Sequence, residues 1–264
     1  MHGIRGPIPR NRMEQIQSAL PRSMALTDTL PSLADPLAAP LVRISKMRAR
    51  VRLSDGWHML NEARIALVEA EACAIFYEEC QRDHTEAVYW CRYYLDDAAL
   101  RLHSSCEHLL RSVDFHWALK VPKKGPLAGE SRDSLIRRVL KTAKQSKDRQ
   151  VRVDVGKLLE QLRSSKAWKA CMKYRNDWVH NRLPPITGLA PDIAFKTFDY
   201  EKELPRAILE DMGLERKKGI GMTVGVGRDI SALRETARSA YCELLRVYEG
   251  LAGILAQDSE GITK

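Results

Sequence analysis

No stretch of about 18 uncharged apolar residues, the length that marks a transmembrane helix, occurs in the 264-residue sequence. We therefore expect no membrane span. The N-terminal arginines are followed by no apolar segment, so we expect no secretory signal peptide either. The six cysteines include no Cys-x-x-Cys pair, which favours reduced, buried thiols in a cytoplasmic protein.

Hydrophobic residues make up 44% and charged residues 29% of the chain, a balance typical of a sequence that folds. Its length suits one elaborated domain better than two. Residues 1–40 contain six prolines and little periodic hydrophobicity, which predicts a flexible N-terminal extension. We place one helical domain over residues 41–264.

Apolar residues recur at three- and four-residue spacing in most of that domain, which predicts amphipathic helices. We expect helices over residues 56–83, 86–117, 131–143, 151–163, 166–180 and 230–256. Asp55, Thr85 and Ser164 or Ser165 are candidate N-caps, and residues 51–53 fit either a short strand or a helix lead-in. The pattern indicates an all-α, up-and-down bundle of five to six helices, with a core over about 57–183 plus a final helix over about 229–257.

Residues 184–228 interrupt the helical pattern. Segments 193–198 and 221–226 have strand-like composition, and a short helix over 204–212 fits between them. The glycine-rich run 219–227 matches neither a Walker loop nor the dinucleotide-binding fingerprint, and we interpret it as part of a hairpin or loop. We therefore expect an insertion that carries a small β-hairpin near residues 190–227.

The net charge of +9 is concentrated in one segment. Residues 120–152 hold 11 lysines and arginines against three acidic residues, a difference of +8. Such a block attracts polyanions through its field and through counterion release, although a solvated helix face has the same composition. Candidate RNA-binding residues inside and beyond the block are Lys123, Lys124, Arg137, Arg138, Lys173 and Arg182.

The hexapeptide 175–180 combines groups suited to cleaving RNA. On an α-helix Asn176 and His180 lie about 40° apart on one face, and the long side chain of Arg175 can fold over that face. Histidine moves protons near neutral pH, arginine offers a planar fork of donors to a phosphate, and an asparagine amide can orient either partner. The alternative is an exposed helix end, in which Arg175 pairs with Asp177 or a neighbour and His180 caps backbone carbonyls.

The pattern Arg-Asn-x-x-x-His late in a helical bundle resembles the HEPN superfamily (higher eukaryote and prokaryote nucleotide-binding). The similarity extends to the long helical segment 93–109 and covers about 57–183 and the last helix. It implies an all-helical bundle, a homodimer that joins two motifs, and metal-independent endoribonuclease activity without a cofactor. Many members act in toxin–antitoxin or antiviral defence systems, and some have lost catalysis. Residues 1–56 and 184–228 have no counterpart in the family.

Other polar residues are weighed against simpler roles. Asp96, Arg101 and Glu107 are candidates to orient His180 or Arg175, although Asp97 and Arg101 also have the spacing of a helix-stabilising pair. His103, Cys106 and His108 point in different directions on one helix, so we expect no metal site there. Trp168 and Trp178 fit a core or a dimer interface better than a base-stacking platform.

The sequence thus predicts an endoribonuclease whose catalytic residues are Arg175, Asn176 and His180. Its products would carry 2′,3′-cyclic phosphate and 5′-hydroxyl ends. Two alternatives keep the same bundle: a catalytically inactive module that binds RNA or a nucleotide, and a protein-interaction subunit. RNA, a second copy of the chain, and a cognate antitoxin or nucleotidyltransferase-type protein are the partners that these hypotheses name.

Overall fold

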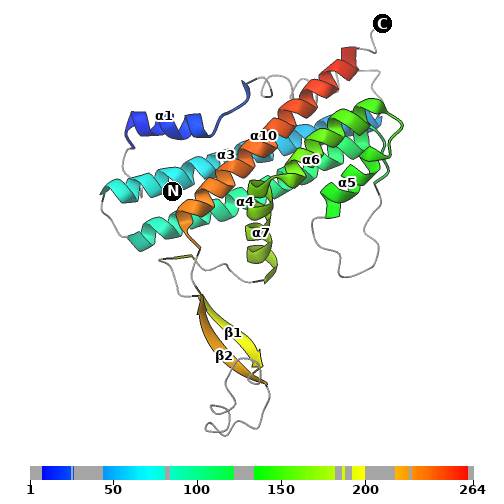
Figure 1. Ribbon diagram of the computed structural model, residues 1–264. Helices are drawn as coiled ribbons and strands as arrows, with labels where there is room; N and C mark the ends of the chain where they lie inside the picture. The colour runs from blue at the N-terminus through cyan, green and yellow to red at the C-terminus, as the bar shows by residue number, and fades with distance from the viewer. Residues whose placement is uncertain are drawn as a thin grey trace.

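The computed structural model describes residues 8–24, 26, 44–80, 84–121, 134–181, 186–187, 192–199, 218–225 and 228–260. For residues 76–80, 84, 134, 180–181, 192–199, 218–225 and 256–260 it describes the backbone alone. The fold is an all-α helical bundle, as the sequence predicts (Figure 1). Six of the seven α-helices formed by these residues correspond to predicted helices.

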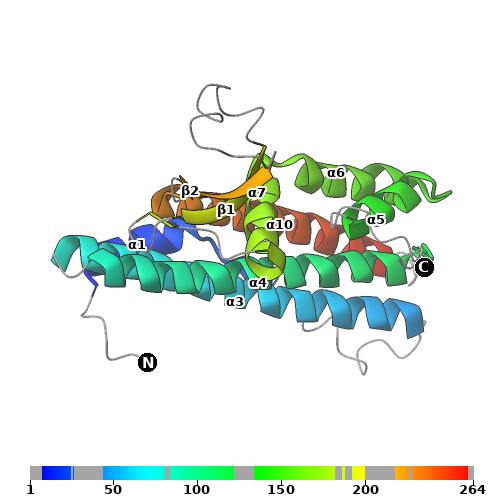
Figure 2. The same ribbon diagram turned by 90° about the horizontal axis from the view of Figure 1, so that it is seen from below.

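Three long helices form the centre of the bundle. Helices α3 (Ile44–Cys80) and α4 (His84–His116) run antiparallel along their length, and α10 (Ile230–Glu260) packs across both (Figures 1 and 2). The apolar residues that recur at three- and four-residue spacing along α4 are all buried: Val88, Cys91, Leu95, Ala98, Leu102, Cys106, Leu109 and Val113. Burial of this stripe against α3 and α10 is what makes a 33-residue helix stable in water.

Helix α3 begins 12 residues before the predicted start at Gly56. Asp55 therefore lies inside the helix and is no N-cap, and residues 51–53 are helical. Gly56 lies where the backbone of α3 meets two other helices. The Ser105 hydroxyl donates to the Gly56 carbonyl at 2.8 Å, and the Tyr248 hydroxyl donates to the Ser105 carbonyl at 2.9 Å. A close helix crossing, rather than a helix start, explains this glycine.

Short helices cover one side of the long ones. They are α5 (Ser134–Lys144), the π-helical turn η1 (Val151–Val155), α6 (Gly156–Ser164) and α7 (Lys166–Asn176), which continues into the π-helical turn η2 (Asp177–Asn181). Of the two candidate caps, Ser164 and Ser165, it is Ser165 that caps α7, because its hydroxyl accepts a hydrogen bond from the Trp168 amide at 3.3 Å. Helix α7 packs against α4 and α10 and ends near one edge of the bundle (Figure 1).

The expected β-hairpin is present. Strands β1 (Asp192–Asp199) and β2 (Lys218–Gly225) pair antiparallel, with Asp192 opposite Gly225. The hairpin projects away from the helices (Figure 1). The short helix predicted over 204–212 lies outside the described residues.

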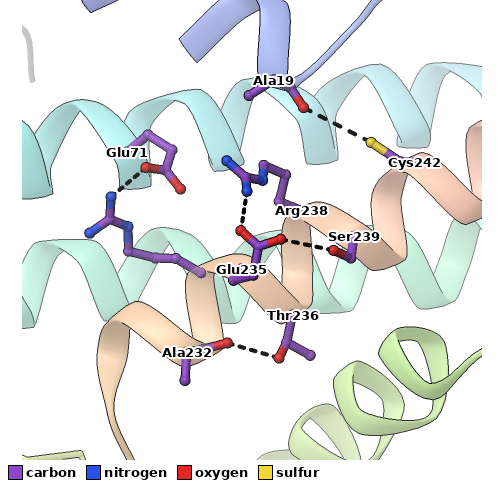
Figure 3. A network of polar contacts seen from close by, with 9 residues as sticks. Ala19, Glu71, Ala232, Glu235, Thr236, Arg238, Ser239 and Cys242 are labelled. Atoms are coloured by element: carbon purple, nitrogen blue, oxygen red, sulfur yellow. Dashed lines mark hydrogen bonds and ion pairs between the residues drawn. The ribbon is translucent and has the colours of Figure 1, made fainter. Parts of the chain in front are cut away.

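Residues 8–24 and Leu26 differ from the expected flexible extension. They include helix α1 (Arg10–Ala19), which packs on α3. Leu20 is fully buried, the Arg64 guanidinium donates to its carbonyl at 2.6 Å, and the Cys242 thiol faces the Ala19 carbonyl (Figure 3). The six prolines of residues 1–40 favour an extension without regular structure, but a few well-spaced apolar side chains are enough to dock part of it. The apolar side chains that it buries are Ile16, Leu20 and Leu26.

Five cysteines with described surroundings are reduced, and four of them are buried. Burial raises the pKa of the Cys171 thiol to about 12, which keeps it protonated and unreactive at neutral pH. No helix in the described part of the chain combines the length and apolarity that crossing a membrane requires.

Candidate active site

The hexapeptide 175–180 spans the junction between α7 and η2. Arg175 and Asn176 end the α-helix, and residues 177–180 lie in the π-helical turn. A π-turn closes its hydrogen bonds over five residues instead of four, so each residue rotates less about the axis. Arg175 and His180, which would be about 140° apart on an α-helix, are therefore brought closer to one face. The structure describes the backbone of His180, while its side chain lies outside the described part of the chain.

The carboxylate of Asp177 lies between two cations. The Lys173 ammonium is 2.8 Å and the Arg228 guanidinium 2.7 Å from the same carboxylate oxygen. The Arg175 guanidinium donates to the Asn176 side-chain oxygen at 3.1 Å. The one acidic group of the hexapeptide is thus neutralised from outside it, and two of the three side chains expected to meet a substrate, Arg175 and Asn176, contact each other.

A buried polar contact fixes α7 on α4. Tyr174 is 1% exposed, and its hydroxyl donates a hydrogen bond to Asp96 of α4. The Arg92 guanidinium lies 3.6 Å from the other oxygen of that carboxylate. Burial raises the pKa of Asp96, and this effect exceeds the lowering by Tyr174 and Arg92. The pKa of Tyr174 is raised by burial and by the adjacent carboxylate, so the phenol remains a donor.

The three residues considered as orienting groups therefore have different environments. Asp96 faces the motif helix, where it accepts a hydrogen bond from Tyr174. Arg101 pairs with Asp97 at 2.8 Å and with Glu62 of α3, which ties α4 to α3. Glu107 is exposed. The contact to α7 singles out Asp96 among the three.

The candidate RNA-binding residues are placed only in part. Arg137 is exposed and Arg138 half-buried on α5, while Lys173 is exposed on α7. Lys123, Lys124 and Arg182 lie outside the described residues. Helix α5 packs against α4, η1 and α6, and the ribbon of Figure 2 shows α5, α6 and α7 along the same side of α4.

Sequence reasoning missed Arg92, Tyr174 and Arg228 as parts of this site. Arg92 and Asp96 have the four-residue spacing of a helix pair, which is a detectable signal. Tyr174 fits the apolar stripe of its helix, which predicts a core residue. Its buried ring agrees with that prediction, but the hydrogen bond from its hydroxyl to Asp96 could not be predicted from the stripe. Arg228 is 51 positions from Asp177 in sequence, and no local pattern predicts such a contact.

Two other residues considered from the sequence, Cys106 and Trp168, lie in the core. Cys106 is buried on the core stripe of α4, and Trp168 is a buried residue of α7. Among the side chains that the structure describes, no group of three or more His, Cys, Asp or Glu residues is arranged to hold a metal ion. Comparison with protein-family models, curated proteins and solved structures finds no match to this chain.

Proposed function

We propose that the protein is a metal-independent endoribonuclease of HEPN type, with Arg175, Asn176 and His180 as its catalytic residues. The observation that carries the proposal is the widened turn at the end of α7, which begins inside the hexapeptide, directly after Arg175 and Asn176. Single π-turns inside helices occur frequently at functional sites. The buried anchor of Tyr174 to Asp96 supports the proposal further, because catalytic groups need a rigid element behind them.

The chemistry follows from the three side chains. The ribose 2′-oxygen attacks the adjacent phosphorus, and the bond from phosphorus to the 5′-oxygen breaks. Histidine exchanges protons with these oxygens, taking one from the 2′-hydroxyl or giving one to the leaving 5′-oxygen. The Arg175 fork stabilises the extra negative charge on the phosphoryl oxygens, and the Asn176 amide orients the substrate or the imidazole. The products are a 2′,3′-cyclic phosphate and a 5′-hydroxyl.

A second copy of the chain completes this scheme. The hexapeptide holds one histidine, whereas in-line cleavage is helped by both an acid and a base. A two-fold dimer that places two motif turns side by side provides both groups. RNA would be drawn to the segment 120–152 by its charge, and a cognate antitoxin or nucleotidyltransferase-type protein is the partner that would hold such an activity in check.

The experiment is cleavage of end-labelled RNA by purified wild type and single variants. We expect His180→Ala to lose about 10²- to 10⁴-fold in rate and Arg175→Ala to lose a comparable factor. Arg175→Lys should rescue only partly, because an ammonium lacks the planar fork, and Asn176→Ala should be milder. The exposed histidine of α3 provides the matched control, His58→Ala, which should cleave like wild type.

Two outcomes of this assay would contradict the proposal. One is a His180→Ala protein as active as wild type. The other is RNA binding without cleavage under every condition tested, which would support the catalytically inactive RNA-binding module instead.

A further inference from the structure

The two ends of the 184–228 insertion meet next to the motif turn. Ile186 and Arg228 form a parallel β-bridge, and the Thr187 amide donates to the Arg228 carbonyl at 3.1 Å. Ile186 is fully buried in the main core. The chain that leaves the motif and the chain that returns from the hairpin are thus held together, and the backbone of Arg228 has a fixed position.

The side chain of Arg228 reaches from that fixed backbone to the motif. Its guanidinium is 2.7 Å from the Asp177 carboxylate and lies over the Tyr174 ring, 5.4 Å from the ring centre. Asp177 is the first residue of η2, and Tyr174 is the residue bonded to Asp96. One arginine from the far end of the insertion therefore touches both the widened turn and the buried anchor of α7.

The other cation on Asp177 acts within a single helical segment. Lys173 is four positions before Asp177, the spacing of adjacent turns of an α-helix. That pair favours regular helix across residues 173–177 and does not relate the turn to the rest of the bundle. Of these two ion pairs, the one with Arg228 is the tertiary contact.

We propose that Arg228 is a positioning residue for the motif turn, so that the return end of the insertion holds η2 in place against Tyr174. The expected effect of Arg228 on RNA cleavage rests on the proposed function, but its expected effect on the structure of the turn does not. Partly exposed ion pairs contribute little to global stability, so the effect of removing the Arg228 side chain should be local to the turn. The insertion thereby helps to position Arg175 and His180 for contact with a substrate.

The test compares Arg228→Ala and Arg228→Lys with a matched control. Arg238 of α10 has the same exposed side-chain fraction as Arg228, 35%, and pairs with Glu235 three positions away (Figure 3). Arg238→Ala therefore removes an equally exposed arginine whose ion pair lies within its own helix. Hydrogen exchange of the amides in 177–181 is measured for each full-length protein, together with its melting temperature and its kcat and KM on RNA.

We expect Arg228→Ala to speed exchange in 177–181 by roughly tenfold, the combined effect of an ion pair and a cation–π contact. Arg238→Ala should leave exchange there unchanged. Arg228→Lys should give an intermediate value, because it keeps a charge for Asp177 but loses the flat guanidinium over Tyr174. In cleavage, Arg228→Ala should lower kcat with little change in KM.

Exchange that is unchanged in Arg228→Ala would overturn the inference, whatever the RNA assay shows. An exchange effect in a protein whose wild type does not cleave RNA would support the inference and count against the proposed function. Equal exchange effects from Arg228→Ala and Arg238→Ala would also overturn it, because the effect would then be global.

Discussion

The hydroxyl group of Tyr174 donates a hydrogen bond to the carboxylate of Asp96, 78 positions away in sequence. This bond joins the helix that carries the motif to the middle of α4. The carboxyl group of Asp96 therefore lies at the interface between the two helices. The packing of α7 on α4 depends on this polar contact as well as on apolar side chains.

Removing that hydroxyl should destabilise the fold. In Tyr174→Phe the half-buried Asp96 loses a donor, and we expect the free energy of unfolding to fall by about 1–3 kcal/mol. Urea denaturation measures the change. Tyr93→Phe is the control, because Tyr93 is 55% exposed and its variant should stay within about 0.5 kcal/mol of wild type. Equal stability of the two variants would show that the hydrogen bond contributes nothing.

The raised pKa of Asp96 makes stability depend on pH in a defined direction. Burial raises the folded-state pKa above the ordinary 3.8, so the folded state favours the protonated carboxyl. The free energy of unfolding that the protonated Asp96 carboxyl contributes is fully present below pH 3.8. It is lost as the pH rises through the folded-state pKa. Wild type should therefore become less stable relative to Asp96→Asn as the pH is raised above that value, measured by denaturation at a series of pH values. A relative gain with rising pH would contradict this account.

Two glycines on long helices should respond to alanine with opposite signs. A Cβ at Gly56 would overlap the Tyr248 hydroxyl and lie 2.8 Å from the Cβ of His108, whereas one at Gly253 would meet nothing within 4 Å. We expect Gly56→Ala to cost about 1–3 kcal/mol through overpacking, and Gly253→Ala to add about 0.5–1 kcal/mol through helix propensity. Thermal unfolding of the two variants tests this. A stabilised Gly56→Ala protein would mean that the three helices do not cross closely there.

The basic segment should affect RNA affinity rather than chemistry. Neutralising Lys123, Lys124, Arg137 and Arg138 should weaken the salt dependence of RNA binding. The slope of the logarithm of the binding constant against the logarithm of salt concentration should fall in magnitude by up to about 0.7 for each phosphate that the protein no longer neutralises. The control replaces four exposed arginines elsewhere, namely Arg10, Arg48, Arg52 and Arg246. Binding is measured over a range of salt concentrations with His180→Ala, so that cleavage does not interfere. Equal slopes for both variants would remove any specific role of the segment.

The periodic spacing of apolar residues predicted most of the fold, because each long helix buries one face against its neighbours. The three- and four-residue spacing of apolar side chains indicated α4 and α10, and Ser165, one of two candidate caps, is the residue that caps α7. The start of α3 was missed because Gly56 resembles a boundary, and only the neighbouring α4 and α10 reveal it as a crossing point.

The site was less predictable because its supports are long-range. Arg175, Asn176 and His180 are close in sequence and form a recognisable pattern. The anchor of Tyr174 to Asp96 and the contact of Arg228 with Asp177 join residues that are 78 and 51 positions apart. Spacing within one helix carries no information about such partners.

The measurement that tests the central claim most directly is the chemistry of the RNA ends at a mapped cut site. Purified wild type is incubated in EDTA with end-labelled RNA and with the same RNA carrying a single 2′-deoxy residue at the cut. We predict 2′,3′-cyclic phosphate and 5′-hydroxyl ends from the first RNA and no cleavage at that position in the second, because the nucleophile is the substrate's own 2′-hydroxyl. Products with 5′-phosphate ends, or undiminished cleavage at the 2′-deoxy position, would contradict the assignment of Arg175, Asn176 and His180 to this reaction.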